Sequence, residues 1–431
     1  MAQENGKPEG RGSNWVYSVL PFNIATGPVG TFVQLYILVL HGTVIDIGLA
    51  ITLFNAVSIP AAMAWGLVTD RMHMRKPIVI ACYLAVAGTL IAFVFTQSIH
   101  GVEVLYAVFS FISAAAATPL NLLIMETQPK SRWAIAFSQF SMASSTGSTI
   151  GLLLGVVWAD YLPLGLIVAP LAFLSLVSAV LSVLMIKEPS FVFEREMIVM
   201  VRRSFYERLL VLPMLFLKIP QAMDFRRVFK GLRNEMTREP QILYMSIFAF
   251  YLASGIFNTS LVPSLYRAEL SKSQVFLVSL SGMLVQAIAF KYAGPYMEKR
   301  NLRATAVSGL VLRALCYAMF GISIFFLTGI GYLASSLIFY PLGAGIAFAA
   351  YYAASNVMVF NMLGHSSKGS VLGVYSAIVG LATMLGSFIS GYTSFYLGYH
   401  VTFIAAALCL GGSAVLTSLL TSQARVQSAT V

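Results

Sequence analysis

The chain carries little charge for its size. Only 10% of its 431 residues are Asp, Glu, Lys or Arg, whereas 58% are hydrophobic and the mean hydropathy is +0.82. A soluble protein of 46.7 kDa needs far more polar surface than this, but a protein surrounded by lipid does not. The composition therefore excludes a soluble globule and predicts an integral membrane protein.

The chain also lacks the residue groups of most catalytic and metal sites. Its three cysteines, Cys82, Cys316 and Cys409, all lie in apolar stretches, which predicts buried free thiols and not disulfides or metal ligands. It contains no Gly-x-x-x-x-Gly-Lys-Ser/Thr segment, which disfavours an ATP-driven pump. We expect no enzyme activity, no cofactor and no metal site.

Long apolar stretches are abundant. Most reach the roughly 20 residues that a helix needs to cross ~30 Å of hydrocarbon, and only helices or closed barrels satisfy the backbone in lipid. The stretches cover residues 15–40, 44–69, 77–97, 104–125, 133–157, 161–186, 241–265, 273–293, 304–328, 330–360, 370–397 and 401–422. The sequence thus predicts an all-α polytopic membrane protein with twelve transmembrane helices. In the first helix, Gly27, Pro28 and Gly30 can loosen the middle.

The positive charges predict the orientation in the membrane. Of the 27 Lys and Arg residues, all except Arg267, Lys272 and Arg313 belong to the termini, the middle loop and the loops of one side. By the positive-inside rule, both termini and the middle loop are then cytoplasmic. The net charge of +11 follows from this topology, and we expect no nucleic-acid binding.

The chain is predicted to divide into five segments. Residues 1–14 are polar and Gly-rich, so we expect them to be disordered, and the full-length apolar run behind them argues against a signal peptide. Residues 15–186 and 241–422 hold six helices each, and residues 423–431 form a tail. Residues 187–240 form a basic amphipathic linker, which either lies on the inner leaflet or binds a regulatory partner.

Two loops share one charged pattern in the same register. Each has a glycine, then an acid and two basic residues: Gly66, Asp70, Arg71 and Arg75 in the first loop, and Gly294, Glu298, Lys299 and Arg303 in the second. Each loop lies between two apolar stretches. The chain is therefore predicted to be one six-helix unit used twice.

Together, the two sets of six helices, the long basic middle loop and the repeated charged loop resemble the major facilitator superfamily of secondary transporters. The resemblance covers nearly the whole chain. The family's loop motif runs Gly, three residues, Asp, Arg, one residue, Gly, Arg, then Arg or Lys, and here His73 and Met74 replace the second Gly and Arg. The resemblance implies two pseudo-symmetric six-helix bundles that rock about a central site.

The charged loops are candidate gates. A carboxylate at a helix end can accept hydrogen bonds from the amides at a neighbouring helix N-terminus, which stabilises the contact by ~0.3 to 2 kcal/mol. The resemblance places Asp70 opposite the helix start near Gly369, and Glu298 opposite the helix start near Trp133. Two more charges could complete the first cluster: Glu126 and Arg132. The alternative is that these charges only set the topology.

Polar side chains inside the helices indicate a solute cavity, because such groups need water or each other in a membrane. By resemblance, helices 1, 4, 7 and 10 line this cavity and helices 2, 5, 8 and 11 flank it. The candidates are Asn23, Thr26, Gln34, Asn55, Thr118, Asn121 and Gln139 in the first half, and Asn258, Gln286, Tyr351, Tyr352, Asn356 and Tyr375 in the second. For any one of them, a hydrogen bond between helices is the alternative. Such a lining suits a small neutral, polar or amphipathic solute.

The helices have no acid in an interior position. Asp46, Glu103, Asp160 and Glu269 are expected at the outer rim of the membrane. A proton-coupled step needs a group whose pKa crosses the ambient pH, usually a carboxylate or histidine. Facilitated diffusion and proton coupling through the rim carboxylates therefore both stay open.

Arg313 is the one charge expected deep in a helix, ~15 Å beyond Arg303 at a rise of about 1.5 Å per residue. A cation at that depth costs at least ~2.5 kcal/mol on insertion scales, so it should face protein or water. It either ties its helix to a neighbour or binds an anionic solute.

These features predict a secondary transporter that moves a small organic solute by alternating access, gated by its cytoplasmic charged loops. We expect it to work as a monomer in the lipid bilayer of the plasma membrane. The alternative is a non-transporting membrane sensor or assembly factor that uses the same fold and acts through its linker. The repeated charged loop favours the transporter, because a static scaffold has no use for two symmetric gates.

Overall fold

The computed structural model describes residues 16–72, 75–127, 133–186, 238–298, 301–362 and 368–420. This part of the chain is helical, and twelve of its spans are long and apolar enough to cross a membrane. The prediction of an all-α protein with twelve transmembrane helices is confirmed. The predicted disordered N-terminus, nearly all of the amphipathic linker and the tail lie outside the described residues, so these remain predictions.

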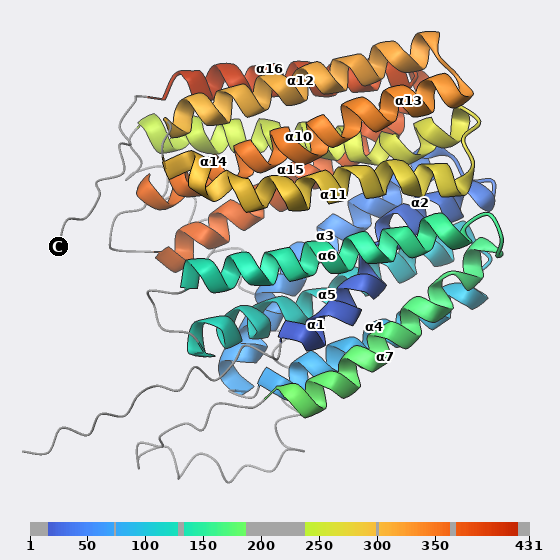
Figure 1. Ribbon diagram of the computed structural model, residues 1–431, viewed down its shortest axis with the longest axis vertical. Coiled ribbons are helices and arrows are strands. Elements are labelled where there is room, and N and C mark those ends of the chain that lie inside the picture. The colour runs from blue at the N-terminus through green and yellow to red at the C-terminus, as the bar shows by residue number, and fades with distance from the viewer. Residues whose placement is uncertain are drawn as a thin grey trace, which may run out of the picture.

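The first half of the chain forms six spans, blue to green in Figure 1. They are α1 (Val16–Thr26) with α2 (Val29–Val39), α3 (Val44–Met72), α4 (Arg75–Phe95), α5 (Ile99–Thr127), α6 (Trp133–Trp158), and the short η2 (Leu164–Leu166) with α7 (Val168–Met185). In this bundle α3 packs against α5, α4 against α5 and α7, and α1 against α6 and α7.

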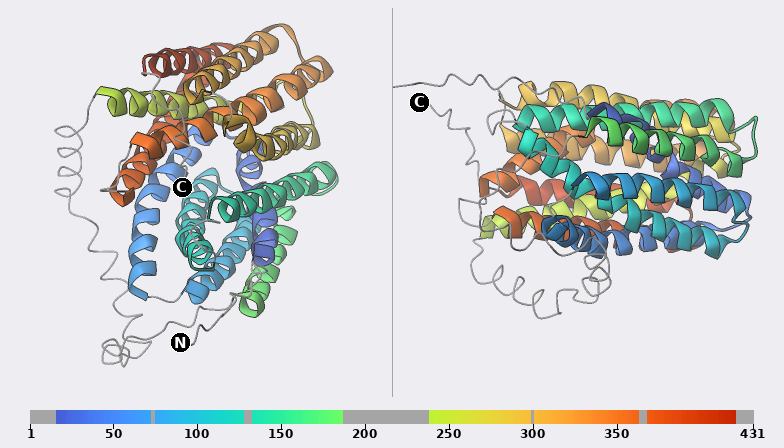
Figure 2. Two further views of the ribbon diagram at one scale, coloured as in Figure 1. Left: turned by 60° about the vertical axis from the view of Figure 1, so that its left-hand side comes forward. Right: turned by 90° about the horizontal axis from the view of Figure 1, so that it is seen from below.

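The second half forms six further spans, yellow to red, which lie beside the first half as a second group in Figures 1 and 2. They are α10 (Arg238–Arg267), α11 (Lys272–Glu298), α12 (Leu302–Phe326), α13 (Gly329–Tyr340) with η4 (Pro341–Ala347) and α14 (Phe348–Met362), α15 (Lys368–Tyr396) and α16 (Tyr399–Ser418). Here α10 packs against α15 and α16, and α12 against α14 and α16.

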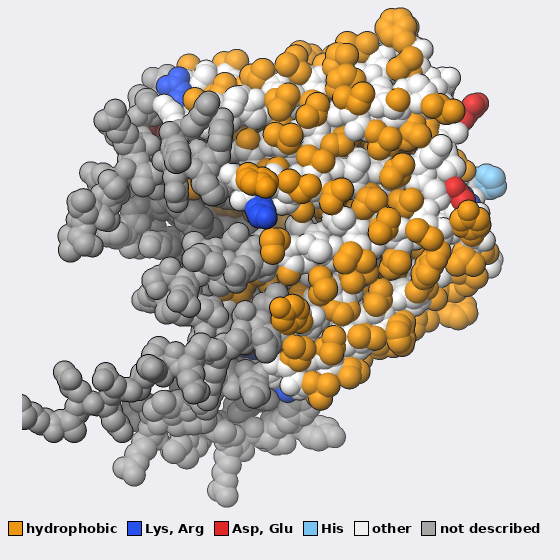
Figure 3. Space-filling view, viewed as in Figure 1, with side chains coloured by type: hydrophobic (Ala, Val, Ile, Leu, Met, Phe, Trp, Pro, Cys, Tyr) orange, Lys and Arg blue, Asp and Glu red, His pale blue; other side chains and the backbone are white. Residues whose placement is uncertain are grey.

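The sides of the helices are covered with exposed apolar side chains, as in a protein that faces lipid. Leu184 and Leu408, for example, are 70% and 72% exposed. Figure 3 shows this orange surface, with the acidic and histidine side chains of the same face gathered at its right-hand end. We call that end, which includes the connections 40–43, 159–163 and 268–271, the distal end, and the opposite end the proximal end.

The first span is broken in its middle, as the sequence predicts. Helix α1 ends at Thr26 and α2 begins at Val29, and Pro28 between them has no N–H to donate. Gly27 lies against α6, where a Cβ would come within 2.5 Å of the Ser148 Cα. Only a glycine at this position allows the first and fifth spans to approach so closely.

The tenth span contains a feature that the sequence did not predict. Between α13 and α14, the segment η4 is π-helical and begins at Pro341. It is pressed between two helices: a Cβ on Gly345 would lie 3.0 Å from the backbone N of Gln286 in α11, and one on Gly343 would lie 3.0 Å from the Cys316 Cβ in α12. Single π-helical turns are frequent at functional sites.

The two bundles meet along α3 and α15. Near the distal end, a Cβ on Gly48 would lie 2.9 Å from the Gly391 Cα. Toward the middle, a Cβ on Gly380 would lie 2.5 Å from Ile59 Cγ1. Two turns further toward the proximal end, no described atom lies within 4 Å of a Cβ placed on Gly66. The close contacts that are described for this pair therefore lie in its distal half and middle.

Candidate functional site

The predicted gate residues that belong to described helices lie at the proximal ends of these helices. Five belong to α3, α5 and α11, with side chains outside the part that the structure describes: Asp70, Arg71, Glu126, Gly294 and Glu298. Two more lie outside the described residues: Arg132 and Lys299. Arg75 begins α4, and Arg303 is the second residue of α12, where its Nη2 donates to the Ser418 carbonyl of α16 in the same bundle. A gate across the bundles stays a prediction.

The distal ends of α6 and α11 hold a contact between bundles that the sequence did not predict. Asp160, just after α6, accepts hydrogen bonds from the Ser271 hydroxyl at 2.9 Å and the Ser273 N–H at 3.2 Å. The Ser273 hydroxyl donates to the Val156 carbonyl at 2.6 Å. Because Ser273 belongs to the first turn of α11, the carboxylate caps that helix where negative charge is favourable.

This contact makes the distal end sensitive to acid. Partial burial raises the pKa of Asp160, but hydrogen bonds from Ser271 and Ser273 and the charge of Lys272 outweigh it, and the pKa lies below its ordinary value of 3.8. Because the contact lowers this pKa, its stabilising effect is complete above the pKa of the free carboxyl group and disappears as the pH falls through the lowered pKa. Acidification from about pH 5 to about pH 3 should therefore loosen the distal contact.

Asp160→Asn should shift the protein toward a state with an open distal end. The amide keeps an acceptor oxygen but loses the charge, which weakens the contact by about 1 kcal/mol and shifts the population about fivefold. The measurement is the distance distribution between spin labels at Leu166 and Ile330, two exposed distal positions in opposite bundles. Asp46→Asn is the matched control, because Asp46 accepts from Thr43 at its own helix start. An Asp160→Asn distance that matches the wild type at pH 7 would contradict this role.

Two amide candidates of the first bundle already have partners. Asn23 donates to the Val19 carbonyl at 3.0 Å and accepts from the Ser144 hydroxyl of α6 at 2.8 Å. In this structure Asn23 therefore makes a hydrogen bond between helices, which is the alternative to a role in the solute cavity. Asn55 accepts from the Thr383 hydroxyl of α15 at 3.5 Å, so it lies where the two bundles meet.

The other amide and threonine candidates differ in exposure. Gln34 is 9% exposed, and its Oε1 has no hydrogen-bond partner among the described residues. Thr26 donates to the Phe22 carbonyl of its own helix at 3.0 Å. The rest are half-buried (Thr118, Gln286 and Asn356), exposed (Asn121 and Asn258) or, for Gln139, in α6 with a side chain outside the described part. Their role as cavity residues stays a prediction.

The predicted cavity tyrosines separate into two groups. Tyr351 points into its own bundle, where it is 1% exposed and its hydroxyl lies 3.5 Å from the Ser246 hydroxyl. Ser246 is also 2.9 Å from the Ser413 hydroxyl and 2.6 Å from that of Thr417. Tyr351 therefore belongs to a buried hydroxyl cluster that joins α10, α14 and α16.

Tyr251, Tyr352 and Tyr375 form the second group, which we call the tyrosine cluster. They come from α10, α14 and α15, and the hydroxyls of Tyr251 and Tyr375 lie 3.3 Å apart. Tyr352 is within electrostatic range of both and is 37% exposed. Since α15 also packs against α3, one of the three helices that form the cluster contacts the first bundle. The sequence predicted Tyr352 and Tyr375 as cavity residues but not Tyr251, because the candidate on that helix was Asn258.

Arg313 contacts two neighbouring helices. It is 3% exposed, and its Nε donates to the Tyr317 hydroxyl at 2.8 Å. Its guanidinium carbon lies 4.8 Å from the ring centroid of Phe250 in α10 and 5.1 Å from that of Phe348 in α14. Arg313 therefore ties α12 to α10 and α14, one of the two roles that the sequence left open.

Glu103 is less exposed than its expected rim position suggests. It begins the second turn of α5 and is 6% exposed, and its Oε2 lies 3.1 Å from His100 Nδ1. Its Oε1 is buried with no hydrogen-bond partner among the described residues. The sequence could predict that this acid lies near a helix end. It could not predict which side chains surround and bury it.

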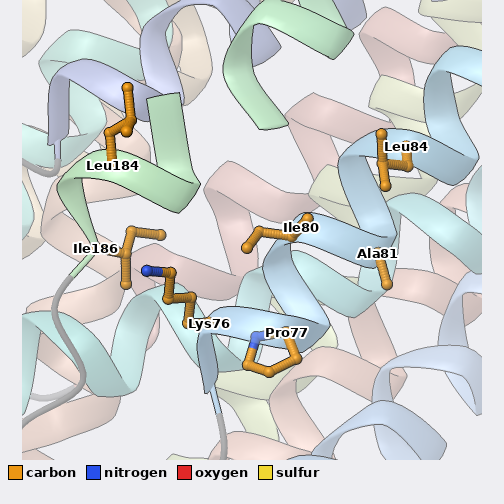
Figure 4. A pocket seen from close by; sticks show the side chains of 7 residues that line it. All are labelled: Lys76, Pro77, Ile80, Ala81, Leu84, Leu184 and Ile186. Carbon is orange, nitrogen blue, oxygen red and sulfur yellow. The ribbon is translucent and has the colours of Figure 1, made fainter. Parts of the chain in front are cut away.

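An open groove lies on the flank of the first bundle. It has a volume of about 640 Å³ and is lined at the start of α4 and the end of α7 by Lys76, Pro77, Ile80, Ala81, Leu84, Leu184 and Ile186, as Figure 4 shows. The Lys76 ammonium donates to the Val183 carbonyl at 2.6 Å. None of the predicted cavity residues lines it. In the described part of the chain, no three His, Cys, Asp or Glu side chains gather where they could hold a metal ion.

Comparison with known proteins identifies the family. The chain matches the sequence model of the Major Facilitator Superfamily over residues 17–217 and 243–430, whereas no curated protein sequence matches it. Among solved structures, it is similar to a mutant of the nucleoside transporter NupG, with 14% identity, a TM-score of 0.70, and coverage of 94% of this chain and 98% of that one. A mutant of the peptide transporter POT in complex with alafosfalin gives 12% identity, a TM-score of 0.70, and coverage of 94% and 92%.

A third similar structure is a bacterial homologue of the human lysosomal transporter Spinster, in an inward-facing and unoccupied conformation. It gives 16% identity, a TM-score of 0.69, and coverage of 96% of this chain and 98% of that one. At these identities, the structural matches show a shared fold. Since the family match extends over both six-helix halves, this chain belongs to the Major Facilitator Superfamily.

Proposed function

We propose that this integral membrane protein is a secondary transporter that moves a small organic solute by alternating access between its two bundles. Its family, its twelve spans and their division into two halves support this function. One observation carries it: the two bundles are in contact at their distal ends, where a Cβ on Gly48 would lie 2.9 Å from the Gly391 Cα and Asp160 accepts a hydrogen bond from Ser271. Contact at one end of two bundles is what one extreme of a rocking motion requires.

The orientation follows from charge. Most Lys and Arg residues belong to the termini, the linker and the loops that follow the proximal helix ends in the sequence, whereas Arg267 and Lys272 lie at the distal end. The positive-inside rule then puts the proximal end in the cytoplasm and the distal end outside the plasma membrane. In this orientation the state described is closed to the outside, and the proximal charged loops would close the protein in the opposite state. We expect a monomer in the bilayer.

The solute site is proposed to lie between the bundles, next to the tyrosine cluster. Tyr352 is partly exposed there, and the hydroxyls of Tyr251 and Tyr375 can donate to a bound solute. Aromatic walls with a few polar groups are typical of small-molecule sites. The half-buried Asn356 lies one turn along α14 from Tyr352 and can add an amide contact.

The test is a search for a solute that both binds and moves. The purified protein is heated with sugars, amino acids, nucleosides, amphipathic drugs and organic anions, and each stabilising solute is then offered to sealed liposomes that contain the protein. We expect at least one solute to raise the melting temperature and to accumulate inside faster than in protein-free liposomes. Asn356→Ala should weaken the stabilisation.

A failure would favour the sensor or assembly factor. If no solute binds or moves, and if a covalent lock between the bundles leaves the cellular activity of the protein unchanged, transport by alternating access is wrong. The linker would then be the part to test as a working surface.

A further inference from the structure

Arg313 has no counter-ion in its own bundle. Between residues 238 and 420 the sequence has three acids, Glu239, Glu269 and Glu298, and all of them lie at helix ends. Arg313 lies in the middle of α12 and is 3% exposed. Its Nη1 is buried and has no hydrogen-bond partner among the described residues. Because an arginine in a protein stays protonated, the bundle contains a buried positive charge that is not neutralised.

The groups around Arg313 stabilise the cation without neutralising it. The rings of Phe250, Tyr317 and Phe348 lie 4.8, 5.2 and 5.1 Å from its guanidinium carbon. A ring face attracts a cation through its quadrupole, but it adds no net charge. The field of Arg313 therefore extends beyond these rings, and more strongly than in water because the surroundings are apolar.

The tyrosine cluster lies directly behind two of these rings. Phe348 stacks on Tyr352 with centroids 5.4 Å apart, and Phe250 meets the edge of Tyr251 at 5.0 Å. Arg313 is within electrostatic range of Tyr251. Only one layer of aromatic rings thus separates the buried charge from the partly exposed Tyr352. An anion beside the cluster would be attracted, and a cation would be repelled.

The same wall favours an apolar body on the solute. Besides Phe348, Tyr352 meets the edge of Phe290 from α11 at 5.8 Å, so aromatic rings from two helices frame it. Stacking on such rings favours flat apolar groups, and the cluster hydroxyls can donate charge-assisted hydrogen bonds to an anionic oxygen.

We propose that Arg313 and the tyrosine cluster select an organic anion with an apolar or aromatic body. Arg313 acts through its field as the residue that determines charge specificity, and the hydroxyls of Tyr251 and Tyr375 make the direct contacts. This proposal rests on the proposed transport function. It replaces the neutral solute that the amide lining suggests with an organic anion as the substrate class.

The first test measures the electrostatic potential at the cluster and needs no known substrate. Tyr352→Cys is introduced into a variant without Cys82, Cys316 and Cys409. This single cysteine is labelled with an anionic and with a cationic methanethiosulfonate reagent, and the two labelling rates are compared. We expect the ratio of the anionic to the cationic rate to fall by about fivefold or more when Arg313→Gln is added. Arg313→Lys keeps the charge and should keep most of the ratio.

The control position is Tyr161, which is 86% exposed at the distal end of the first bundle. Its rate ratio should not respond to Arg313→Gln. If that variant does not fold, the second test below still decides in the wild-type protein. No change of the ratio at Tyr352 with Arg313→Gln would overturn the proposal.

The second test compares two probes that differ only in charge. We expect 2-naphthoate to raise the melting temperature more than uncharged 2-naphthamide, and this difference should disappear with Arg313→Gln. Arg267→Gln is the matched control, because Arg267 also faces a tyrosine ring, that of Tyr399 at 5.9 Å, but lies exposed at the distal end. Equal stabilisation by the two probes would overturn the anion preference.

The two proposals can fail separately. Neither the rate ratio nor the melting temperature requires a solute to cross the membrane. If solutes are transported but Arg313→Gln changes neither readout, the charge selection is wrong. If a lock between the bundles leaves transport unchanged, the alternating-access proposal is wrong instead.

Discussion

A disulfide between Thr31→Cys and Ser279→Cys is expected to reduce solute uptake to background. The two hydroxyl oxygens lie 3.4 Å apart and belong to α2 and α11, one from each bundle. Cysteines at this spacing can form a disulfide with little backbone movement. The bond would hold the bundles together on the distal side, and the protein could no longer open toward that side.

The measurement is uptake of a solute found in the binding screen, in a background without the three native cysteines, before and after oxidation. A reducing agent should restore the uptake rate of the oxidised variant. The matched control is a disulfide within one bundle, between Ser394→Cys and Thr402→Cys, whose hydroxyls are 3.0 Å apart. This control should leave uptake near its starting rate. Full uptake by the oxidised Thr31–Ser279 variant would show that the distal contact does not have to open.

Gly48→Val is expected to have the opposite effect and to force the distal end open. A Cβ at this position would lie 2.9 Å from the Gly391 Cα and 3.1 Å from the Ser387 carbonyl oxygen of the other bundle. Overpacking of this kind destabilises a contact by about 1 to 3 kcal/mol, which corresponds to a population shift of about 5- to 150-fold. The closed distal contact should become the minor state.

The distance between spin labels at Leu166 and Ile330 measures this shift. Gly48→Val should add a longer distance or make it dominant. Gly88→Val is the control, because no described atom lies within 4 Å of a Cβ placed on Gly88 of α4. If Gly48→Val leaves the distance unchanged while the protein stays folded, the α3–α15 contact does not hold the distal end closed.

The sequence predicts the membrane architecture well because its signals are local. Long apolar runs mark each of the twelve spans, and Gly27 with Pro28 marks the break between α1 and α2. The repeated loop pattern indicates two related halves, and the family match covers both of them. The π-helical segment η4 has no such local signal in the sequence. It depends on how Gly343 and Gly345 approach α12 and α11, which one sequence does not show.

The candidate site was harder to predict, because a residue type does not reveal the direction in which a side chain points. Tyr351 and Tyr352 are neighbours in the sequence, yet one is buried among hydroxyls and the other is partly exposed in the tyrosine cluster. Asp160 was recognisable as an acid near a helix end, but its partner Ser271 is 111 positions away in the other half. The depth of Arg313 could be predicted, whereas its aromatic neighbours from other helices, Phe250 and Phe348, could not.

Distances measured at both ends of one protein test alternating access most directly. Labels at Leu166 and Ile330 report on the distal end, and labels at Leu184 and Tyr292, both exposed, report on the proximal ends of α7 and α11. We expect opposite changes: conditions that lengthen the distal distance, such as Gly48→Val, shorten the proximal one. If the proximal distance stays constant while the distal distance lengthens, or if both lengthen together, the bundles do not rock about a central site.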